Sequence, residues 1–363
     1  MILRWLAALV AFVIVAMVGI VVFGNFGGDP TAANNSWALI AAIGLVLAFL
    51  AYAGVEYAQT GGLASIARQF DTRTIVLMPF AIALNIILGQ AVGAALKIPI
   101  YLDSIGTILV GALAGPIAGA LTGFLSNILW TYVLPAPFNS SIAAAFAVVA
   151  AVIGLMAGLF GRAGWLRPRP NRGPGELVLG AVVALLVVGA MALYAYSRFY
   201  AGGLAFFNPE LKPDPIFVVL GWIVALIFLA FIVGFLALLF LRRDLTVAYV
   251  VVAGVATGMV AALISAPIAA NVFSGVTGSG TDFLVAAFRQ GGSDIATATF
   301  QQGLLSDPVD KLVTFFTVYL ILNAMARRTK ARFPQGERLI ERGDGLDDEL
   351  PPPAAPDREG APA

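Results

Sequence analysis

Long apolar runs dominate this sequence and constrain its fold more than any other feature. Most are close to or above the ~20 apolar residues that a helix needs to cross a lipid bilayer. Charged residues make up only 11% of the 363 residues, against roughly 25% in a typical soluble domain. We therefore predict an all-α polytopic membrane protein. The runs cover residues 6–23, 37–55, 74–96, 105–134, 141–160, 177–196, 215–241, 246–268 and 312–326.

The run 105–134 is too long for one comfortable crossing and is interrupted by Gly115-Pro116. Its glycines recur every four residues, a spacing that lets helix backbones approach closely. We predict two short helices, about 105–114 and 117–130, packed as a tight hairpin. They would be either two short crossings or a re-entrant pair. The glycines are Gly111, Gly115, Gly119 and Gly123.

Basic residues indicate the orientation, because cytoplasmic loops are enriched in Lys and Arg. The basic clusters fall on one side if the run 105–134 is counted as two passes, which gives about ten helices. Both termini are then cytoplasmic, and the segments 97–104 and 271–311 face outward. The basic residues are Arg4, Arg162, Arg167, Arg169, Arg172, Arg242, Arg243, Arg327, Arg328, Lys330 and Arg332.

The composition also limits the chemistry. The chain has no Cys and no His, which excludes thiolate or imidazole metal sites, cysteine nucleophiles and Ser-His-Asp triads. A net charge of +1 gives no reason to expect nucleic acid as a partner. No phosphate-binding loop of the Gly-Lys-Ser/Thr type occurs. We expect no metal site, no cofactor and no enzymatic activity.

The outer segment 97–104 is the first candidate ligand site. It combines a cation, an aromatic ring, an anion and a hydroxyl in Lys97, Tyr101, Asp103 and Ser104. Asp and Ser are also favoured as N-caps, so one of the last two can instead cap the helix that begins at residue 105. The two roles are compatible.

The outer segment 271–311 is the second candidate. Its stretch GVTGSGTD (275–282) offers free backbone N–H groups that can approach a ligand, and it includes Thr281 and Asp282. A plain flexible connector is the alternative. Just before the last run we expect Asp307 to cap the helix, and Asp310 and Lys311 to need separate partners. Gln301 and Gln302 belong to the same cluster.

Polar residues inside apolar runs are the third signal, because they are expensive at membrane depth. Asn85 and Asn127 lie in such runs and either contact a ligand or join helices by hydrogen bonds. No acidic residue lies deep in a predicted span, which argues against a proton relay.

Six segments, ordered and well separated along the chain, can be compared with known families. They are LNIILGQ (84–90), IPIYLDSIGT (98–107), GPIAG (115–119), GFLSN (123–127), GVTGSGTD (275–282) and SDPVDK (306–311). Together they resemble the membrane-embedded substrate-binding (S) components of energy-coupling factor (ECF) vitamin transporters, most closely the riboflavin type. The resemblance covers residues 74–160 and 246–334.

The resemblance implies a six-helix core with both ends cytoplasmic. Residues 74–163 would hold its first four helices, and residues 245–330 its last two with an outer loop. Two helical hairpins would be additions, one at residues 1–73 with a cytoplasmic connector and one inserted at 164–244. We expect residues 331–363, which are Pro-rich and charged, to be a disordered cytoplasmic tail.

The resemblance also implies a function. The chain would capture a vitamin-like small molecule from outside a bacterial or archaeal plasma membrane. A transmembrane coupling subunit and two ATPases would drive release inward. Small residues on the first core helix would contact the coupling subunit, or else pack within the chain: Ala81, Gly89 and Gly93. The substrate contacts would come from Asn85, Lys97, Tyr101, Asp103, Asn127, Thr281, Asp282 and Gln302.

Two other functions stay open at this point. A membrane sensor or scaffold would signal through the cytoplasmic tail, although that tail has no recognisable signalling domain. A self-sufficient secondary transporter would take up its solute without partners.

Overall fold

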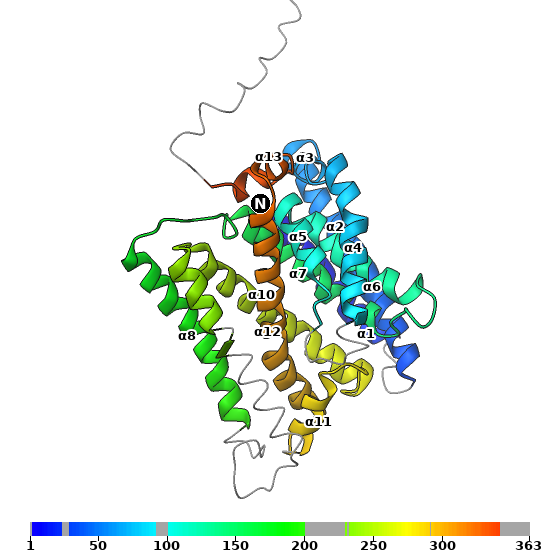
Figure 1. Ribbon diagram of the computed structural model, residues 1–363. Coiled ribbons are helices and arrows are strands. Elements are labelled where there is room, and N and C mark those ends of the chain that lie inside the picture. The colour runs from blue at the N-terminus through cyan, green and yellow to red at the C-terminus, as the bar shows by residue number, and fades with distance from the viewer. Residues whose placement is uncertain are drawn as a thin grey trace, which may run out of the picture.

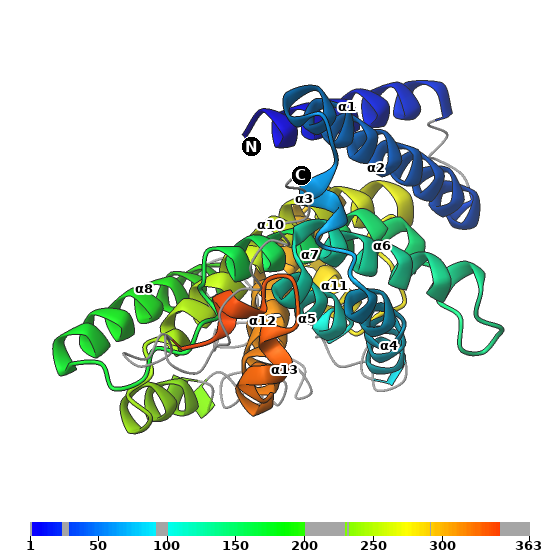
Figure 2. The same ribbon diagram turned by 90° about the horizontal axis from the view of Figure 1, so that it is seen from above.

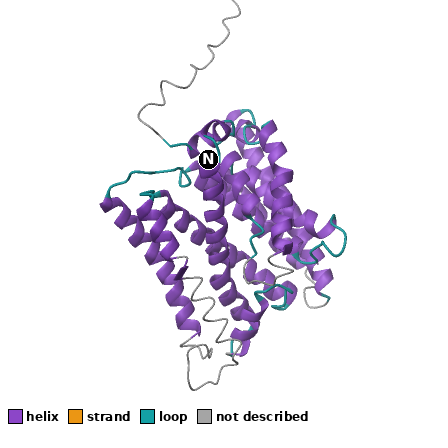
Figure 3. Cartoon of the chain, in the orientation of Figure 1, coloured by secondary structure: helices purple, strands orange, loops and turns teal. Residues whose placement is uncertain are grey.

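The computed structural model describes residues 2–23, 29–91, 101–199, 229–230, 232–290 and 292–341. Within these ranges every regular element is a helix, as Figure 3 shows. Five of the helical stretches are long and apolar enough to cross a membrane. This confirms the all-α prediction and indicates a membrane-embedded protein. The five are Ile2–Phe23, Thr31–Thr60, Thr72–Ala91, Ala143–Arg162 and Thr246–Phe273.

Two long helices, α1 (Ile2–Phe23) and α2 (Pro30–Thr60), form an N-terminal hairpin. Asp29 caps α2 by accepting a hydrogen bond from the N–H of Thr31, and Pro30 fits the first helical turn. Most of α1 is exposed apolar surface, consistent with a lipid-facing helix. Viewed from above, the hairpin lies on one flank of the molecule (Figure 2).

The next helices are α3 (Ala64–Ala67), α4 (Thr72–Leu88), α5 (Ile105–Ala114) and α6 (Pro116–Tyr132). The break at Gly115, where φ is 133°, separates α5 from α6, and α5 has the bounds expected from the sequence. A side chain is strained at that φ, which explains the glycine.

The glycines of the hairpin pack mainly against a third helix. After the short 3₁₀ helix η2 (Ala143–Phe146), α7 (Ala147–Arg162) runs beside both α5 and α6. A Cβ on Gly119 or Gly111 would collide with the backbone of Gly154. The four-residue spacing therefore serves a three-helix contact.

Helix α8 (Pro174–Phe199) and the helical segment Ile232–Leu241 form the opposite flank of the molecule (Figure 2). They occupy the place of the hairpin expected at 164–244. Residues 200–228 lie outside the described residues.

The last long helices differ from the sequence-based expectation. Helix α10 (Thr246–Phe273) is followed by α11 (Asp282–Gln290) and by α12 (Ile295–Ala324), whose cap is Asp294. The segment 271–311 is thus largely helical. The expectation that Asp307 caps the last span is wrong, because α12 begins twelve residues earlier and continues through Pro308. Gly258 of α10 has no Cβ to collide with Pro308, so the two helices pack closely there.

The first residues assigned to the tail are also ordered. Helix α13 (Arg327–Ala331) and the 3₁₀ helix η3 (Gly336–Leu339) fold back onto the core. The N–H of Gln335 donates to the Leu113 carbonyl, and Leu339 is fully buried. This corrects the expected disorder for residues 331–341; residues 342–363 lie outside the described residues.

In Figure 1 the N-terminus, α3 and α13 lie at one end of the bundle, and α11 lies at the other. The core between the flanks is built from α5, α7, α10 and α12, with buried Val and Ala side chains and a few large ones such as Phe315 and Tyr319. Small side chains let these helices approach closely, as is typical of helix contacts in membranes.

Candidate functional site

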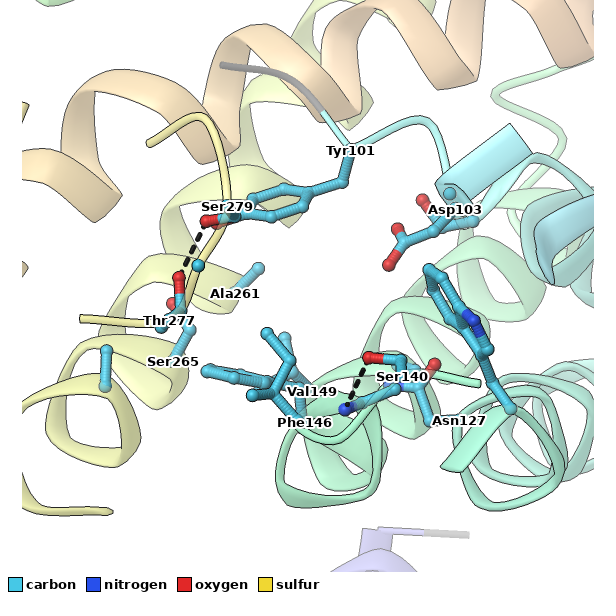
Figure 4. Close-up of a pocket in the computed structure, with 18 of the residues that line it drawn as sticks. Tyr101, Asp103, Asn127, Ser140, Phe146, Val149, Ala261, Ser265, Thr277 and Ser279 are labelled. Atoms are coloured by element: carbon cyan, nitrogen blue, oxygen red, sulfur yellow. Dashed lines mark hydrogen bonds between the residues drawn. The ribbon is translucent and has the colours of Figure 1, made fainter. Parts of the chain in front are cut away.

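A cavity of about 430 Å³ lies toward the α11 end of the bundle. Segments that are far apart in the sequence meet around it (Figure 4). The lining includes Gly89, Gln90, Tyr101, Asp103, Ser104, Asn127, Trp130, Phe146, Val149, Ile153, Ala261, Ser265, Thr277, Ser279, Gln302, Asp307 and Lys311.

One wall joins the loop before α5 to the glycine-rich segment before α11. The Tyr101 hydroxyl lies 2.7 Å from the Thr281 hydroxyl and 3.5 Å from that of Ser279. Burial raises the pKa of Tyr101, so it stays a neutral phenol that can donate or accept. Figure 4 shows the Tyr101 ring extending toward Ser279 at the edge of the cavity.

Asp282 shapes this glycine-rich segment. Its carboxylate accepts from the N–H and hydroxyl of Thr277 (3.0 and 2.7 Å) and from the N–H of Gly278 (2.6 Å). Gly278 has a φ of 77° and Gly275 one of 79°, conformations that favour glycine. Asp282 therefore holds the turn that presents Thr277 and Ser279, and it does not itself line the cavity.

The charged wall is carried by α12 and the loop before α5. Lys311 forms an ion pair with Asp310, donates to the Ser104 hydroxyl (2.9 Å) and lies 3.7 Å from an Asp103 oxygen. The other Asp310 oxygen accepts from the N–H groups of Tyr101 (3.0 Å) and Leu102 (2.9 Å). Asp310 and Lys311 thus bond to each other, contrary to the expectation of separate partners, and they anchor the loop to α12.

Ser104 precedes α5 but makes no capping hydrogen bond with its side chain. Its hydroxyl accepts from Lys311 instead. Asp103 points into the cavity (Figure 4), and its side chain is 26% exposed. Burial raises the pKa of Asp103 above its ordinary value, opposed by Lys311 and reinforced by Asp310.

A chain of polar groups continues along α12. The Gln302 amide donates to the Ser306 hydroxyl (2.6 Å), which donates to Asp307 (3.2 Å). The other Asp307 oxygen accepts from Ser265 of α10 (2.9 Å). Gln302, Asp307 and Ser265 all reach the cavity surface.

Most of the remaining surface of the cavity is apolar, with the neutral polar residues Gln90, Asn127, Asn139, Ser140 and Ser141 among the lining. Trp130 is fixed by a hydrogen bond from its indole N–H to the Phe138 carbonyl (3.1 Å), and Phe146 stacks on Phe273 with ring centroids 5.8 Å apart. Val149 and Ala261 complete this surface, which faces the polar wall (Figure 4). A cavity with an apolar body and a few polar groups is typical of small-molecule sites.

The sequence-predicted substrate contacts fall into three groups. Tyr101, Asp103, Asn127 and Gln302 line the cavity. Thr281 and Asp282 support its wall from behind. Lys97 lies outside the described residues.

Asn85 lies behind the cavity rather than on its surface. Its amide donates to the hydroxyls of Thr107 (2.8 Å) and Ser126 (2.9 Å), and its oxygen accepts from the N–H of Gly106 (2.7 Å). Three helices, α4, α5 and α6, are joined at this one buried side chain. The structure thus gives Asn85 the interhelical role that was the alternative to ligand contact.

The small residues considered for partner coupling face the inside of the chain. Ala81 packs against Gly106, and Gly89 packs against Trp130, where any Cβ would collide. Gly93 lies outside the described residues. The exposed face of α4 carries larger apolar side chains: Ile75, Val76, Phe80 and Ile87.

Two lining residues, Asp307 and Lys311, were singled out from the sequence but were not predicted to contact the substrate. A start of the last helix near residue 312 placed them outside the membrane core. Ser265, Trp130 and Phe146 carry no distinguishing sequence signal, because single aromatic and hydroxyl residues are common in apolar runs.

Comparisons with protein-family models, with curated proteins and with solved structures find no match to this chain.

Proposed function

We propose that this chain is the substrate-binding membrane subunit of an ECF-type importer and that its cavity captures a vitamin-like small molecule. The observation that carries the proposal is the convergence of the 101–104 loop, α6, the 277–279 segment and α12 on one cavity of about 430 Å³. That volume suits a vitamin-sized molecule, since ligand pockets of about 300–1,000 Å³ bury most of a drug-sized ligand. The segments whose sequence resembles S components supply much of its lining.

In this proposal the chain performs no chemistry and hydrolyses no ATP. Substrate enters from the outside, and the 101–104 loop and the 277–279 segment cover it. The apolar wall excludes water. A coupling subunit and two ATPases in the plasma membrane then drive release into the cytoplasm. The predicted additions to a compact S component are the hairpins within residues 1–73 and 164–244, and no described residue of either range lines the cavity.

The test is to purify the full chain in mild detergent and identify any small molecule that it retains by mass spectrometry. We expect a retained or added vitamin-like molecule to raise the melting temperature without ATP. We also expect a coupling subunit and ATPases to co-purify from the native membrane. If no organic molecule binds and no such subunits co-purify, the proposal is refuted, and the sensor or scaffold function is favoured.

A self-sufficient ion-coupled transporter is the second candidate, because acidic side chains lie inside α12. Asp310 is fully buried and Asp307 nearly so, whereas the sequence suggested no acidic residue deep in a span. Buried acidic groups are typical of proton and ion relays. Uptake of the retained molecule by proteoliposomes that contain only this chain and an ion gradient would establish this function. Uptake that requires the ATPase partners would exclude it.

A further inference from the structure

The cavity wall carries more acidic than basic side chains. In the described part of the chain they are three aspartates, Asp103, Asp307 and Asp310, and one lysine, Lys311. Lys97 lies outside the described residues, and counting it would still leave one negative charge in excess. The wall is therefore acidic even though the chain as a whole carries a net charge of +1.

The lysine is already occupied by protein groups. Lys311 is paired with Asp310, donates to Ser104 and faces Asp103. Asp310 is fully buried behind the wall, where its second oxygen also holds the backbone of the loop. An ammonium group has three donors, and Asp310 and Ser104 take two of those of Lys311. The Asp103 carboxylate, 3.7 Å away, competes with any anionic ligand for the third.

The two remaining carboxylates face the cavity without a cation of their own. Asp307 is held by the hydroxyls of Ser265 and Ser306, which are neutral. Asp103 has only the shared Lys311, at 3.7 Å, and keeps part of its surface open to the cavity. A carboxylate that is removed from water is costly unless an opposite charge or a proton compensates it.

The opposite surface is mainly apolar and partly aromatic, with Asn127 and Ser140 as neutral polar groups beside the rings (Figure 4). Trp130 and Phe146 come from different helices and both line the cavity. Tyr101 adds a third ring at its edge (Figure 4). Rings of this kind accept the flat body of a heterocycle and also attract cations through their faces.

We infer that the cavity takes a small organic cation with a flat aromatic or apolar body. Its cationic group, an amine, an amidine or a positively charged ring nitrogen, pairs with Asp103 on the wall that also carries Asp307. Its flat body lies against Trp130 and Phe146. This inference rests on the proposed function, because it names the class of substrate for the same cavity.

The test compares three probes with one ring and different charges: benzamidinium, benzamide and benzoate. Binding to the full chain in detergent is measured by calorimetry and thermal unfolding after any retained ligand has been removed. We expect benzamidinium to bind at least tenfold more tightly than benzamide, and benzoate not to bind. Benzamide binding as tightly as benzamidinium, benzoate binding more tightly, or no binding of benzamidinium at millimolar concentration would each overturn the inference.

Variants locate the effect. Asp103→Asn keeps the shape and removes the charge, so benzamidinium affinity should fall at least tenfold while benzamide affinity stays the same. Asp103→Glu should restore the preference for the cation. Asp294→Asn is the matched control, since Asp294 is an exposed helix cap on α12 outside the cavity lining. Full benzamidinium affinity in Asp103→Asn contradicts the inference.

The two proposals fail in different ways. If a neutral or anionic molecule is retained or stabilises the chain, capture stands and the cationic class is wrong. If no organic molecule binds and no partner subunits co-purify, the capture function itself is wrong.

Discussion

At the scale of single residues, Asp103 is the charged side chain that we expect to contact the ligand most directly. It points into the cavity and lies near Lys311. We expect Asp103→Ala to lower affinity for the retained molecule by more than tenfold, or about 1.4 kcal/mol, because a charged partner is lost. Calorimetry on the purified variant measures this, with Asp294→Asn as control. Unchanged affinity would reduce Asp103 to a structural role in the loop.

The raised pKa of Asp103 gives a pH dependence whose sign is fixed. Burial favours the protonated form, and Asp310 adds to this, while Lys311 opposes it; Asp307 and Tyr101 also face the cavity. A protonated carboxyl cannot pair with a cation, so benzamidinium affinity should rise as pH increases from about 4 through the raised pKa and then level off.

Benzamide affinity should stay flat over the same pH range. The folded state holds the Asp103 proton more tightly than the unfolded chain, so this group's contribution to stability falls as pH rises. Calorimetry of benzamidinium and benzamide at a series of pH values checks the predicted pH dependence of affinity. A benzamidinium affinity that does not change with pH would show that protonation of Asp103 does not affect ligand binding.

Asn85 has a structural role that can be separated from binding. Its three hydrogen bonds join α4, α5 and α6 at a site that is 1% exposed. Asn85→Ala leaves buried donors and acceptors unpaired, and we expect a loss of about 1–3 kcal/mol in stability. Thermal unfolding should show a lower melting temperature, with ligand affinity reduced by less than tenfold. Asn271→Ala, which removes an exposed hydrogen bond, is the control.

At the scale of elements, glycines decide how closely α5, α6 and α7 pack. A Cβ on Gly154 would collide with the backbone of Gly119, which cannot move aside as a flexible side chain can. We expect Gly154→Ala to destabilise the protein by about 1–3 kcal/mol through overpacking.

The matched control is Gly54→Ala on α2, where a Cβ would meet nothing within 4 Å. Replacing a glycine inside an exposed helix stabilises it by up to about 1 kcal/mol. Thermal melts of the two variants should therefore shift in opposite directions. Equal shifts would mean that the close contact of α6 with α7 adapts at no cost.

The start of helix α12 could not be predicted from the local sequence. Its polar residues and Pro308 are signals that usually end or begin a helix. Here Gly258 and Gly254 of α10 lie against Pro308 and Leu312, and the buried pair Asp310–Lys311 is satisfied within the bundle. Packing against α10 therefore compensates for features that would break an isolated helix.

At the scale of the whole molecule, the N-terminal hairpin braces the cavity wall. The indole N–H of Trp37 on α2 donates to the Ala145 carbonyl (2.9 Å), and Asn34 donates to the Ser141 carbonyl (2.8 Å). Ser141 itself lines the cavity, and Ala145 immediately precedes Phe146, which also lines it. The N-terminal hairpin thus supports the cavity wall through hydrogen bonds from α2.

Trp37→Phe tests this support. We expect stability to fall by about 0.5–1.5 kcal/mol through the lost hydrogen bond, with a smaller than tenfold loss of affinity. Trp5→Phe is the matched control, because the Trp5 indole N–H is buried without a hydrogen-bond partner in the described part of the chain. If both variants melt alike, the bond to Ala145 does not stabilise the wall.

Composition and local pattern were enough to predict a helical, membrane-embedded protein, because apolar runs of this length with so little charge have few other folds available. The sequence also located the break at Gly115-Pro116, where backbone chemistry acts locally, and it singled out Tyr101, Asp103, Asn127 and Gln302 as polar residues worth attention. These features depend on composition and on neighbours along the chain.

Which polar groups face a common cavity depends on contacts between helices that are distant in sequence. The tertiary structure assigned Asn85 to a helix junction, paired Lys311 with Asp310, and brought Asp307, Trp130 and Phe146 to the same surface. The role of a buried charged side chain depends on its hydrogen-bond and ion-pair partners. Those partners lie on other segments, up to about two hundred residues away in the sequence. Spacing along one helix cannot specify such partners, whereas close packing through glycines brings them within hydrogen-bonding distance.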